Sequence, residues 1–199
     1  MRDSILEIRS LFAGYGSEPV LKDFSLSLDR GTRVIVCGPN GSGKTTLLKC
    51  ILGIIKPLSG TIKLLDGCSI AYCKQDFPKQ NFPITAREVV EMGLSGRNHD
   101  AVQSAMSKTG TLELSERLFW SLSGGERQRV SLARCYCQNA DLLLLDEPSS
   151  FLDTQSRDDF ISMMKNMADP KLSVIAVTHD DQIVSSLGWN VVQLSKGRM

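Results

Sequence analysis

The chain has 199 residues, the length of one domain, and can bury a hydrophobic core without disulfide or metal cross-links. Its 23 basic and 22 acidic side chains leave a formal charge of +1, without the basic excess of a general nucleic-acid-binding protein. With 42% hydrophobic and 23% charged residues, the composition is that of a globular protein and excludes wholesale disorder.

The first part of the chain predicts short strands around one helix. Residues 23–29 alternate apolar and polar side chains, which is typical of a half-buried strand. The apolar run 33–37 predicts a strand buried on both faces, followed by a glycine-rich turn and by apolar residues at helical spacing over 47–55. Further short strands are predicted at 61–65 and 69–73.

The second part of the chain predicts a parallel arrangement with one interruption. From about 83 to 122 the pattern is helical, and Phe160, Met163, Met164 and Met167 form a core stripe on a later helix. The elements predicted after the interruption are a helix at 124–138, a strand at 141–146, a helix at 155–168 and strands at 172–177 and 190–194. Alternating strands and helices indicate an α/β fold with a mainly parallel sheet, in which 83–122 is a helical insertion.

The cysteines and the apolar runs indicate a reducing, cytosolic setting. Six cysteines and two histidines show no zinc-type spacing, and Cys135 and Cys137 point different ways on a predicted helix. We therefore expect reduced thiols that serve as small core residues. No apolar run approaches the roughly 18 residues of a membrane span, and the N-terminal residues lack the apolar segment of a signal peptide.

The strongest motif lies at 38–45, where Gly-Pro-Asn-Gly-Ser-Gly-Lys-Thr matches the phosphate-binding pattern G-x-x-x-x-G-K-[ST]. Its glycines let backbone N–H groups converge on phosphate oxygens, and the following helix adds a partial positive charge. We expect Lys44 to reach the outer phosphates and the Thr45 hydroxyl to bind Mg²⁺. A chance glycine-rich turn is disfavoured by the position between a strand and a helix.

Two further motifs add to this site. Asp146 and Glu147 end an apolar strand; an acidic pair there is usually a solvated turn, but the phosphate loop favours Mg²⁺ binding and activation of water. In 122–129, Leu-Ser-Gly-Gly-Glu-Arg-Gln-Arg, Ser123 and Glu126 form a capping box. The box leaves two helix-weakening glycines unexplained, and these suit a helix end that approaches a phosphate closely.

The order of these three motifs resembles the nucleotide-binding subunit of ABC transporters over nearly the whole chain. The resemblance implies one ABC-type ATPase domain over residues 1–199. It implies a P-loop NTPase fold with a mainly parallel sheet, an antiparallel β part and a short helical subdomain. ATP and Mg²⁺ are the implied ligands, and the implied activity is ATP hydrolysis coupled to transport across a membrane.

The resemblance also assigns roles to residues. It implies ATP binding by Tyr15, Gly38, Pro39, Asn40, Gly41, Ser42, Gly43, Lys44, Thr45 and Thr46 and, from a second subunit, by Ser123, Gly124 and Gly125. It implies catalytic roles for Lys44, Gln75, Glu147 and His179, and metal ligation by Thr45, Gln75 and Asp146. Tyr15 would stack on adenine, although a lone tyrosine is more often a core residue. Asp153 matches the loop after the acidic pair, where Phe151 departs from the usual small residue.

Residues 82–97 resemble the corresponding segment in importers of manganese, zinc, iron or iron chelates. The resemblance implies a contact between this segment and an integral membrane permease; the alternative is an ordinary amphipathic helix with Phe82 and Ile84 in the core. It further implies a head-to-tail homodimer, an extracytoplasmic substrate-binding protein in the same system, and no nucleic acid. The expected location is the cytoplasmic face of the cell membrane.

Two departures and three alternatives remain open at this point. The stretch from Gln75 to Ser123 is shorter than in relatives, and the chain stops soon after 190–194, so it is either a minimal subunit or one that has lost its end. The alternatives are a short ABC ATPase of another transporter, such as a haem-export type, a soluble ABC ATPase acting on ribosomes or DNA, and an ATP sensor that does not hydrolyse. The near-neutral charge and the single ATP site disfavour a soluble ATPase that acts on ribosomes or DNA. The presence of Gln75, Glu147 and His179 disfavours a sensor that does not hydrolyse ATP.

Overall fold

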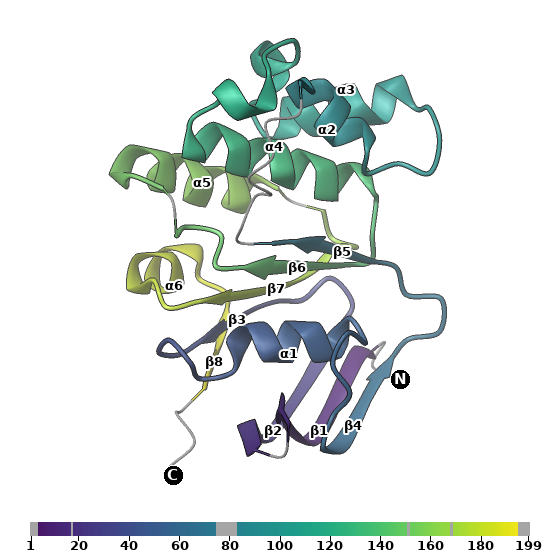
Figure 1. The fold of residues 1–199 in the computed structure, drawn as a ribbon, viewed down its shortest axis with the longest axis vertical. Helices are drawn as coiled ribbons and strands as arrows, with labels where there is room; N and C mark the ends of the chain where they lie inside the picture. Colours follow the sequence, from purple (N-terminus) through teal and green to yellow (C-terminus); the bar gives the residue numbers. More distant parts are fainter. Residues whose placement is uncertain (1–3, 17, 75–82, 151, 168, 195–199) are drawn as a thin grey trace.

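The computed structural model describes residues 4–16, 18–74, 83–150, 152–167 and 169–194, which form two sheets and their covering helices (Figure 1). The strands are β1 Ser4–Tyr15, β2 Glu18–Asp29, β3 Arg33–Cys37, β4 Ser59–Leu64, β5 Ile70–Cys73, β6 Leu142–Asp146, β7 Ser173–Thr178 and β8 Asn190–Gln193. The helices are α1 Lys44–Ile51, α2 Ala86–Glu91, α3 His99–Lys108, α4 Gly124–Cys137, α5 Thr154–Asn166 and α6 Asp181–Leu187, with 3-10 turns at Leu112–Leu114 and Phe119–Ser121.

The larger sheet is parallel and has the strand order β5-β6-β7-β3-β8. Its central strands are buried on both faces, as the apolar runs predict. Because successive side chains alternate across a strand, Leu142 and Leu144 pack into the core that contains α1, whereas Leu143 and Leu145 pack with α4, α5 and α6 on the other face. The carboxyl ends of β3, β6 and β7 therefore meet along one edge of the sheet.

The smaller sheet is antiparallel, with the order β2-β1-β4. Helix α1 lies between the two sheets (Figure 1), and its apolar residues share one core with β1 and β2. This sandwich fixes α1, and so the loop before it, relative to both sheets.

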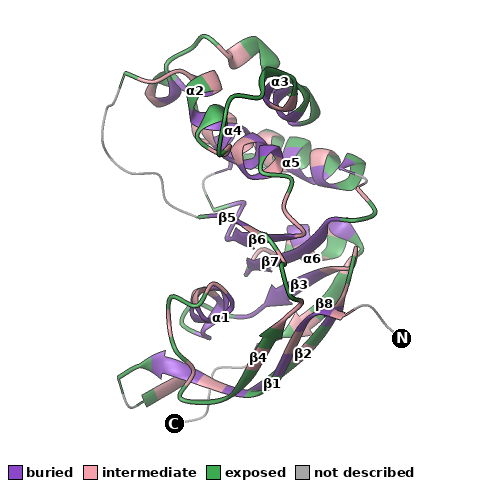
Figure 2. Cartoon of the chain, turned by 90° about the vertical axis from the view of Figure 1, so that its right-hand side faces the viewer, coloured by how far each residue is buried: buried purple, intermediate pink, exposed green. Residues whose placement is uncertain are grey.

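Helices α2, α3 and α4 form a separate layer with its own core (Figures 1 and 2). Helix α2 begins with a capping box formed by Thr85 and Glu88. Helix α4 joins the layers, since Val130 and Ala133 pack with α2 and α3 while Leu132 packs on the parallel sheet. The helical insertion predicted at 83–122 is therefore α2, α3 and the two 3-10 turns, covered by α4.

The sequence patterns predict neither β1 nor α6 as individual elements, and they extend the first helix too far. The register of β1 against β2 shifts between Ile8 and Leu11, where Ser10 has φ 41°, and this bulge breaks the alternation of buried and exposed side chains. Helix α6 has only seven residues, too few for a clear helical period. Helix α1 ends at Ile51, although apolar spacing continues to Ile55.

Most of the cysteines are buried, as the sequence predicts, and Cys68 is the least buried of them. Cys135 packs in the core under the parallel sheet and Cys137 in the core of the helical layer, so the two face different ways. Cys68, beyond the end of β4, is only partly buried and packs against the edge of the core that contains α1. Among the described residues, no helix has the length and apolar character needed to cross a bilayer.

Candidate active site

The loop between β3 and α1 has the backbone of a phosphate cradle. Gly41 and Gly43 have φ of 81° and 95°, in the left-handed region that glycine adopts without strain. A Cβ added to Gly38 would lie 2.6 Å from the carbonyl oxygen of Leu194, so this position has no room for a side chain. The buried hydroxyl of Ser42 has no hydrogen-bond partner among the described residues.

Three side chains from three elements meet at the carboxyl edge of the parallel sheet. The buried Lys44 Nζ lies 3.2 Å from Glu147 Oε1 and donates to the carbonyl oxygen of Gly38 at 2.7 Å. The other oxygen of Glu147, Oε2, lies 2.9 Å from Nδ1 of His179. The sequence predicts these three as catalytic residues, and the fold brings them into contact.

The backbone of Glu147 is unusual. Its φ is 48°, a left-handed value that is uncommon outside glycine, and its N–H donates to the carbonyl oxygen of Val177 at 2.9 Å. Strained backbone of this kind concentrates at functional sites, where the surrounding structure holds it in place. Here it turns the carboxylate toward Lys44 and His179.

Asp146 is held by two hydroxyl groups. Its Oδ1 accepts from Thr45 Oγ1 at 3.0 Å and its Oδ2 accepts from the Tyr72 hydroxyl at 2.8 Å. Burial raises the pKa of Asp146, and the hydrogen bonds from Tyr72 and Thr45 oppose this rise. Burial and the neighbouring carboxylate also raise the pKa of Tyr72 well above its usual range. Tyr72 on β5 lies three residues before Gln75, but the sequence does not show that its hydroxyl reaches Asp146.

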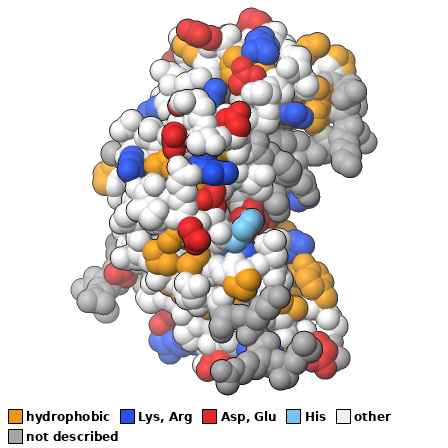
Figure 3. All heavy atoms as spheres, turned by 90° about the vertical axis from the view of Figure 1, so that its left-hand side faces the viewer, with side chains coloured by type: hydrophobic (Ala, Val, Ile, Leu, Met, Phe, Trp, Pro, Cys, Tyr) orange, Lys and Arg blue, Asp and Glu red, His pale blue; other side chains and the backbone are white. Residues whose placement is uncertain are grey.

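A cleft of about 570 Å³ opens in front of this cluster. It is lined by Tyr15, Val20, Asn40, Gly41, Gly43, Lys44, Thr45, Thr46, Glu147 and His179. Tyr15 is 62% exposed, so the interpretation as a core residue is wrong, and Lys49 Nζ donates to its hydroxyl at 2.9 Å. Figure 3 shows a face on which a histidine side chain lies beside acidic and basic side chains.

The remaining predicted cradle residues, Gly38, Pro39 and Ser42, support the loop rather than line this cleft. The carbonyl oxygens of Gly38 and Pro39 accept from Lys44 at 2.7 and 3.2 Å. The loop therefore orients the lysine as well as the backbone N–H groups.

The predicted capping box at the start of α4 is confirmed. The backbone N–H of Ser123 donates to Glu126 Oε2 at 2.8 Å, and Ser123 Oγ accepts from the N–H of Glu126 at 3.3 Å. This contact holds the pKa of the Glu126 carboxyl below its ordinary value. Gly125 has a reason within the chain, because a Cβ there would lie 2.7 Å from Ser156 Oγ on α5. None of the described residues lining the cleft comes from this helix end.

The other positions that the sequence singles out either have roles outside the cleft or lie outside the described residues. Asp153 is the N-cap of α5 and accepts from the N–H of Ser156 at 2.8 Å. Ile84 packs against the core of the helical layer. This agrees with the alternative in which the segment is an ordinary amphipathic helix with Ile84 in the core. Gln75, Phe82 and Phe151 lie outside the described residues.

The donor set fits a magnesium–nucleotide complex. The Thr45 hydroxyl and the Asp146 carboxylate, joined at 3.0 Å, supply the oxygen ligands that Mg²⁺ prefers. The glycine backbone before α1 suits phosphate oxygens.

Comparisons with known proteins agree with these features. Residues 21–150 match the family model described as ABC transporter. The chain is 32% identical to the ATP-binding protein of the high-affinity zinc uptake system of Bacillus subtilis, over 98% of this chain and 92% of that protein. It is also 32% identical to the ATP-binding protein of the Bacillus subtilis manganese transport system, over 89% of this chain and 78% of that protein. A metal-chelate type ABC transporter in an inward-facing conformation superposes with a TM-score of 0.86 at 29% identity, covering 98% of this chain and 81% of that chain.

Proposed function

The chain belongs to the ABC transporter family, and we propose that it hydrolyses ATP to drive the import of a metal ion or metal chelate through a membrane permease. The observation that carries the proposal is the contact of Lys44, Glu147 and His179 at the end of the cleft. The kind of cargo rests on the relatives, which serve zinc uptake, manganese transport and metal-chelate transport.

Hydrolysis proceeds by in-line attack of a water molecule on the γ-phosphate of ATP: the water oxygen bonds to the γ-phosphorus while the bond to the bridging oxygen breaks, and ADP leaves. Glu147 accepts the proton of this water, while Lys44 and His179 stabilise the negative charge that develops on the phosphate oxygens. The Glu147 carboxylate itself contacts Lys44 at 3.2 Å. ATP must therefore compete for Lys44, and the release of Glu147 from this ion pair frees the carboxylate to act on water.

Thr45 and Asp146 would hold Mg²⁺, together with Gln75. The ion would neutralise charge on the outer phosphates. Tyr72 fixes one Asp146 oxygen, so that the carboxylate keeps a defined orientation before any ligand arrives. Tyr15, exposed at the rim of the cleft, would stack on adenine, and its hydroxyl is oriented by Lys49.

A second copy of the chain completes the site. Ser123, Gly124 and Gly125 lie at the start of α4 and do not line the cleft of their own chain, so the Ser123 hydroxyl and the N–H groups of Gly124 and Gly125 would be available to the γ-phosphate bound by a partner. A head-to-tail dimer would bring each helix end to the other subunit's phosphate loop.

The permease would dock on the helical layer, and the chain would lie on the cytoplasmic face of the membrane. A hollow of about 540 Å³ lies there between α2 and α3, lined by Glu91, Leu94, Ser95, Gly96, Arg97, Asn98, His99 and Val102. Met92, beside it, is 64% exposed. An extracytoplasmic substrate-binding protein would deliver the cargo to the permease, and no nucleic acid takes part.

The experiment is an uptake assay in the organism that encodes the chain. We expect deletion of the gene to abolish ATP-dependent uptake of one cargo among radioactive zinc, manganese and iron chelate. The parental gene should restore uptake and a Glu147→Gln variant should not. Unchanged uptake of all three cargoes in the deletion strain would overturn the assignment to metal import.

A further inference from the structure

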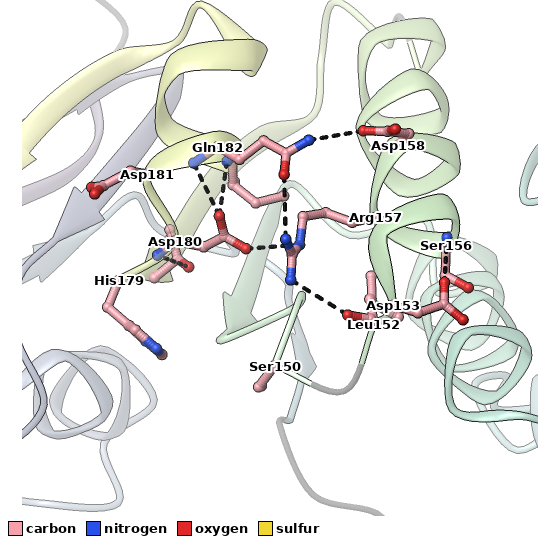
Figure 4. A network of polar contacts seen from close by, with 12 residues as sticks. Ser150, Leu152, Asp153, Ser156, Arg157, Asp158, His179, Asp180, Asp181 and Gln182 are labelled. Carbon is pink, nitrogen blue, oxygen red and sulfur yellow. Dashed lines mark hydrogen bonds and ion pairs between the residues drawn. The ribbon is translucent and has the colours of Figure 1, made fainter.

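Arg157, in the first turn of α5, connects three segments near the cleft (Figure 4). Its Nε lies 3.0 Å from Asp180 Oδ2, its Nη1 donates to Gln182 Oε1 at 3.2 Å, and its Nη2 donates to the carbonyl oxygen of Leu152 at 3.4 Å. A guanidinium group has a rigid fork of donors that can serve several acceptors at once. Arg157 therefore joins the segment before α5 to the start of α6.

Asp180 is held from both sides. Its Oδ1 accepts from the N–H groups of Gln182 and Ile183 at 3.0 and 3.3 Å, which caps α6, and its own N–H donates to Thr178 Oγ1 at 3.1 Å. With one oxygen on α6 and the other on Arg157, the carboxylate has little freedom. The backbone of the preceding residue, His179, is fixed with it.

His179 depends on this backbone for its position. Its side chain is 48% exposed, so surrounding atoms do not enclose the ring. In Figure 4 the imidazole points away from the Arg157 network, while Asp180 points into it. The network therefore acts on the ring through the chain that joins the two residues and not by direct contact.

The Leu152 end of the network leads back to the same site. Leu152 lies between Glu147 and α5, and its N–H donates to the carbonyl oxygen of Ser149 at 3.0 Å. Arg157 thus joins the segment that follows Glu147 to the segment that follows His179. The two side chains at the far ends of these segments, Glu147 and His179, contact each other at 2.9 Å.

We propose that Arg157 is a positioning residue for ATP hydrolysis: by tying Asp180 to Leu152, it holds the His179 imidazole against Glu147. The inference rests on the proposed function, since it assigns Arg157 a role in that reaction. Catalytic groups must keep their geometry to within a fraction of an ångström. Loss of this contact therefore lowers the rate of the chemical step and leaves the affinity for nucleotide unchanged.

The first test compares steady-state hydrolysis and nucleotide binding in Arg157→Met, Arg157→Lys and Lys165→Met. Lys165 is an exposed cation in the last turn of the same helix and serves as the matched control. We expect Arg157→Met to lower kcat by up to about 100-fold, with unchanged KM and nucleotide affinity. Arg157→Lys should recover part of the loss, because lysine can pair with Asp180 without the other two contacts. Lys165→Met should behave as the parent.

A double-mutant cycle separates positioning from a general structural defect. If Arg157 acts through His179, Arg157→Met should cause no further loss in single-turnover hydrolysis when His179 is already Ala. The same factor of loss in both backgrounds would overturn the inference. Asp180→Asn gives a second route, because asparagine keeps the α6 cap but breaks the ion pair. Asp180→Asn alone should lower the hydrolysis rate as much as Arg157→Met does. The double variant should be no slower than either single variant.

A readout without ATP keeps this inference distinct from the proposed function. The chain contains only two histidines, His99 and His179, so their imidazole proton signals can be assigned by substituting one of them. In Arg157→Met the His179 signal should shift and the His99 signal should stay in place. An unmoved His179 signal overturns the inference, whereas a parent that hydrolyses no ATP overturns the proposed function and leaves this measurement valid.

Discussion

Glu147 combines burial, a left-handed backbone and contacts with both Lys44 and His179. A non-glycine residue in this conformation costs of order 1–3 kcal/mol, which the neighbouring strands β6 and β7 must offset. The sequence identifies the acidic pair through its place after an apolar strand. It cannot reveal the backbone conformation, because that follows from the contact of the Glu147 N–H with Val177 on another strand.

Tyr15 provides the first test at the residue scale. Replacing it with alanine should weaken ATP binding by about 1–3 kcal/mol, the scale of stacking between a base and an aromatic ring. Tyr15→Phe should have a small effect, since it loses only the hydrogen bond from Lys49 and keeps the ring. Fluorescence titration with ATP measures both. An alanine variant that binds ATP as the parent does would show that the ring does not stack on adenine.

Tyr72 provides a second test, directed at the metal ligands. Tyr72→Phe removes the donor to Asp146 Oδ2 while the ring keeps its volume. We expect the Mg²⁺ affinity of the ATP-bound protein to fall by about tenfold, as is common when a residue that orients a metal ligand is lost. Tyr136→Phe removes a hydroxyl that contacts Lys108 in the helical layer and is the control. The measurement is a titration of Mg²⁺ at fixed ATP, and equal affinities in the two variants would contradict the role of Tyr72.

At the scale of elements, the sequence predicts the parts that have a regular period and misses those without one. The apolar runs of β3, β6 and β7 and the stripe on α5 are found where expected, because burial on both faces or on one helix face leaves a clear pattern. Strand β1 is missed because its bulge disrupts the alternation. Tyr72 and Arg157 are missed for another reason: their partners lie on other elements, so only the folded chain brings them together.

Helix α4 gives a prediction of its own. Ser123→Ala removes the acceptor for the Glu126 N–H and should destabilise the chain by about 1 kcal/mol in urea denaturation. Ser123→Asp keeps a good N-cap and should keep the parental stability. Its added charge would, however, repel the γ-phosphate bound by a partner subunit. A stable Asp variant that hydrolyses ATP as well as the parent would argue against a role of this helix end in the partner's site.

At the scale of the whole molecule, the two sheets and α1 hold the phosphate loop, while the helical layer carries the start of α4. None of the described residues that line the cleft comes from the start of α4, so in the proposed dimer a second copy would bring its helix end to the phosphate loop. The dimer is therefore the unit that the proposed reaction needs. In the sequence, Gly124 and Gly125 at the start of α4 point to such a dimer, although Gly125 also makes room for Ser156 within its own chain.

Trapping the dimer tests this arrangement. Glu147→Gln leaves Lys44, Thr45 and Asp146 in place, so ATP should still bind and, uncleaved, should join two subunits. Size-exclusion chromatography with ATP should show a dimer for this variant and mainly monomer for the parent. Adding Ser123→Arg should abolish the dimer, because a bulky side chain would block the approach to the γ-phosphate. A trapped dimer that persists with Ser123→Arg would contradict the head-to-tail arrangement.

The most direct test of hydrolysis at this site is the rate of phosphate release by Glu147→Gln compared with the parent, at saturating ATP and Mg²⁺. Removing a positioned base typically costs about 10²–10⁴ in rate. We predict that phosphate release falls by that factor while ATP binding is retained. Phosphate release at the parental rate would contradict the assignment of Glu147 as the base.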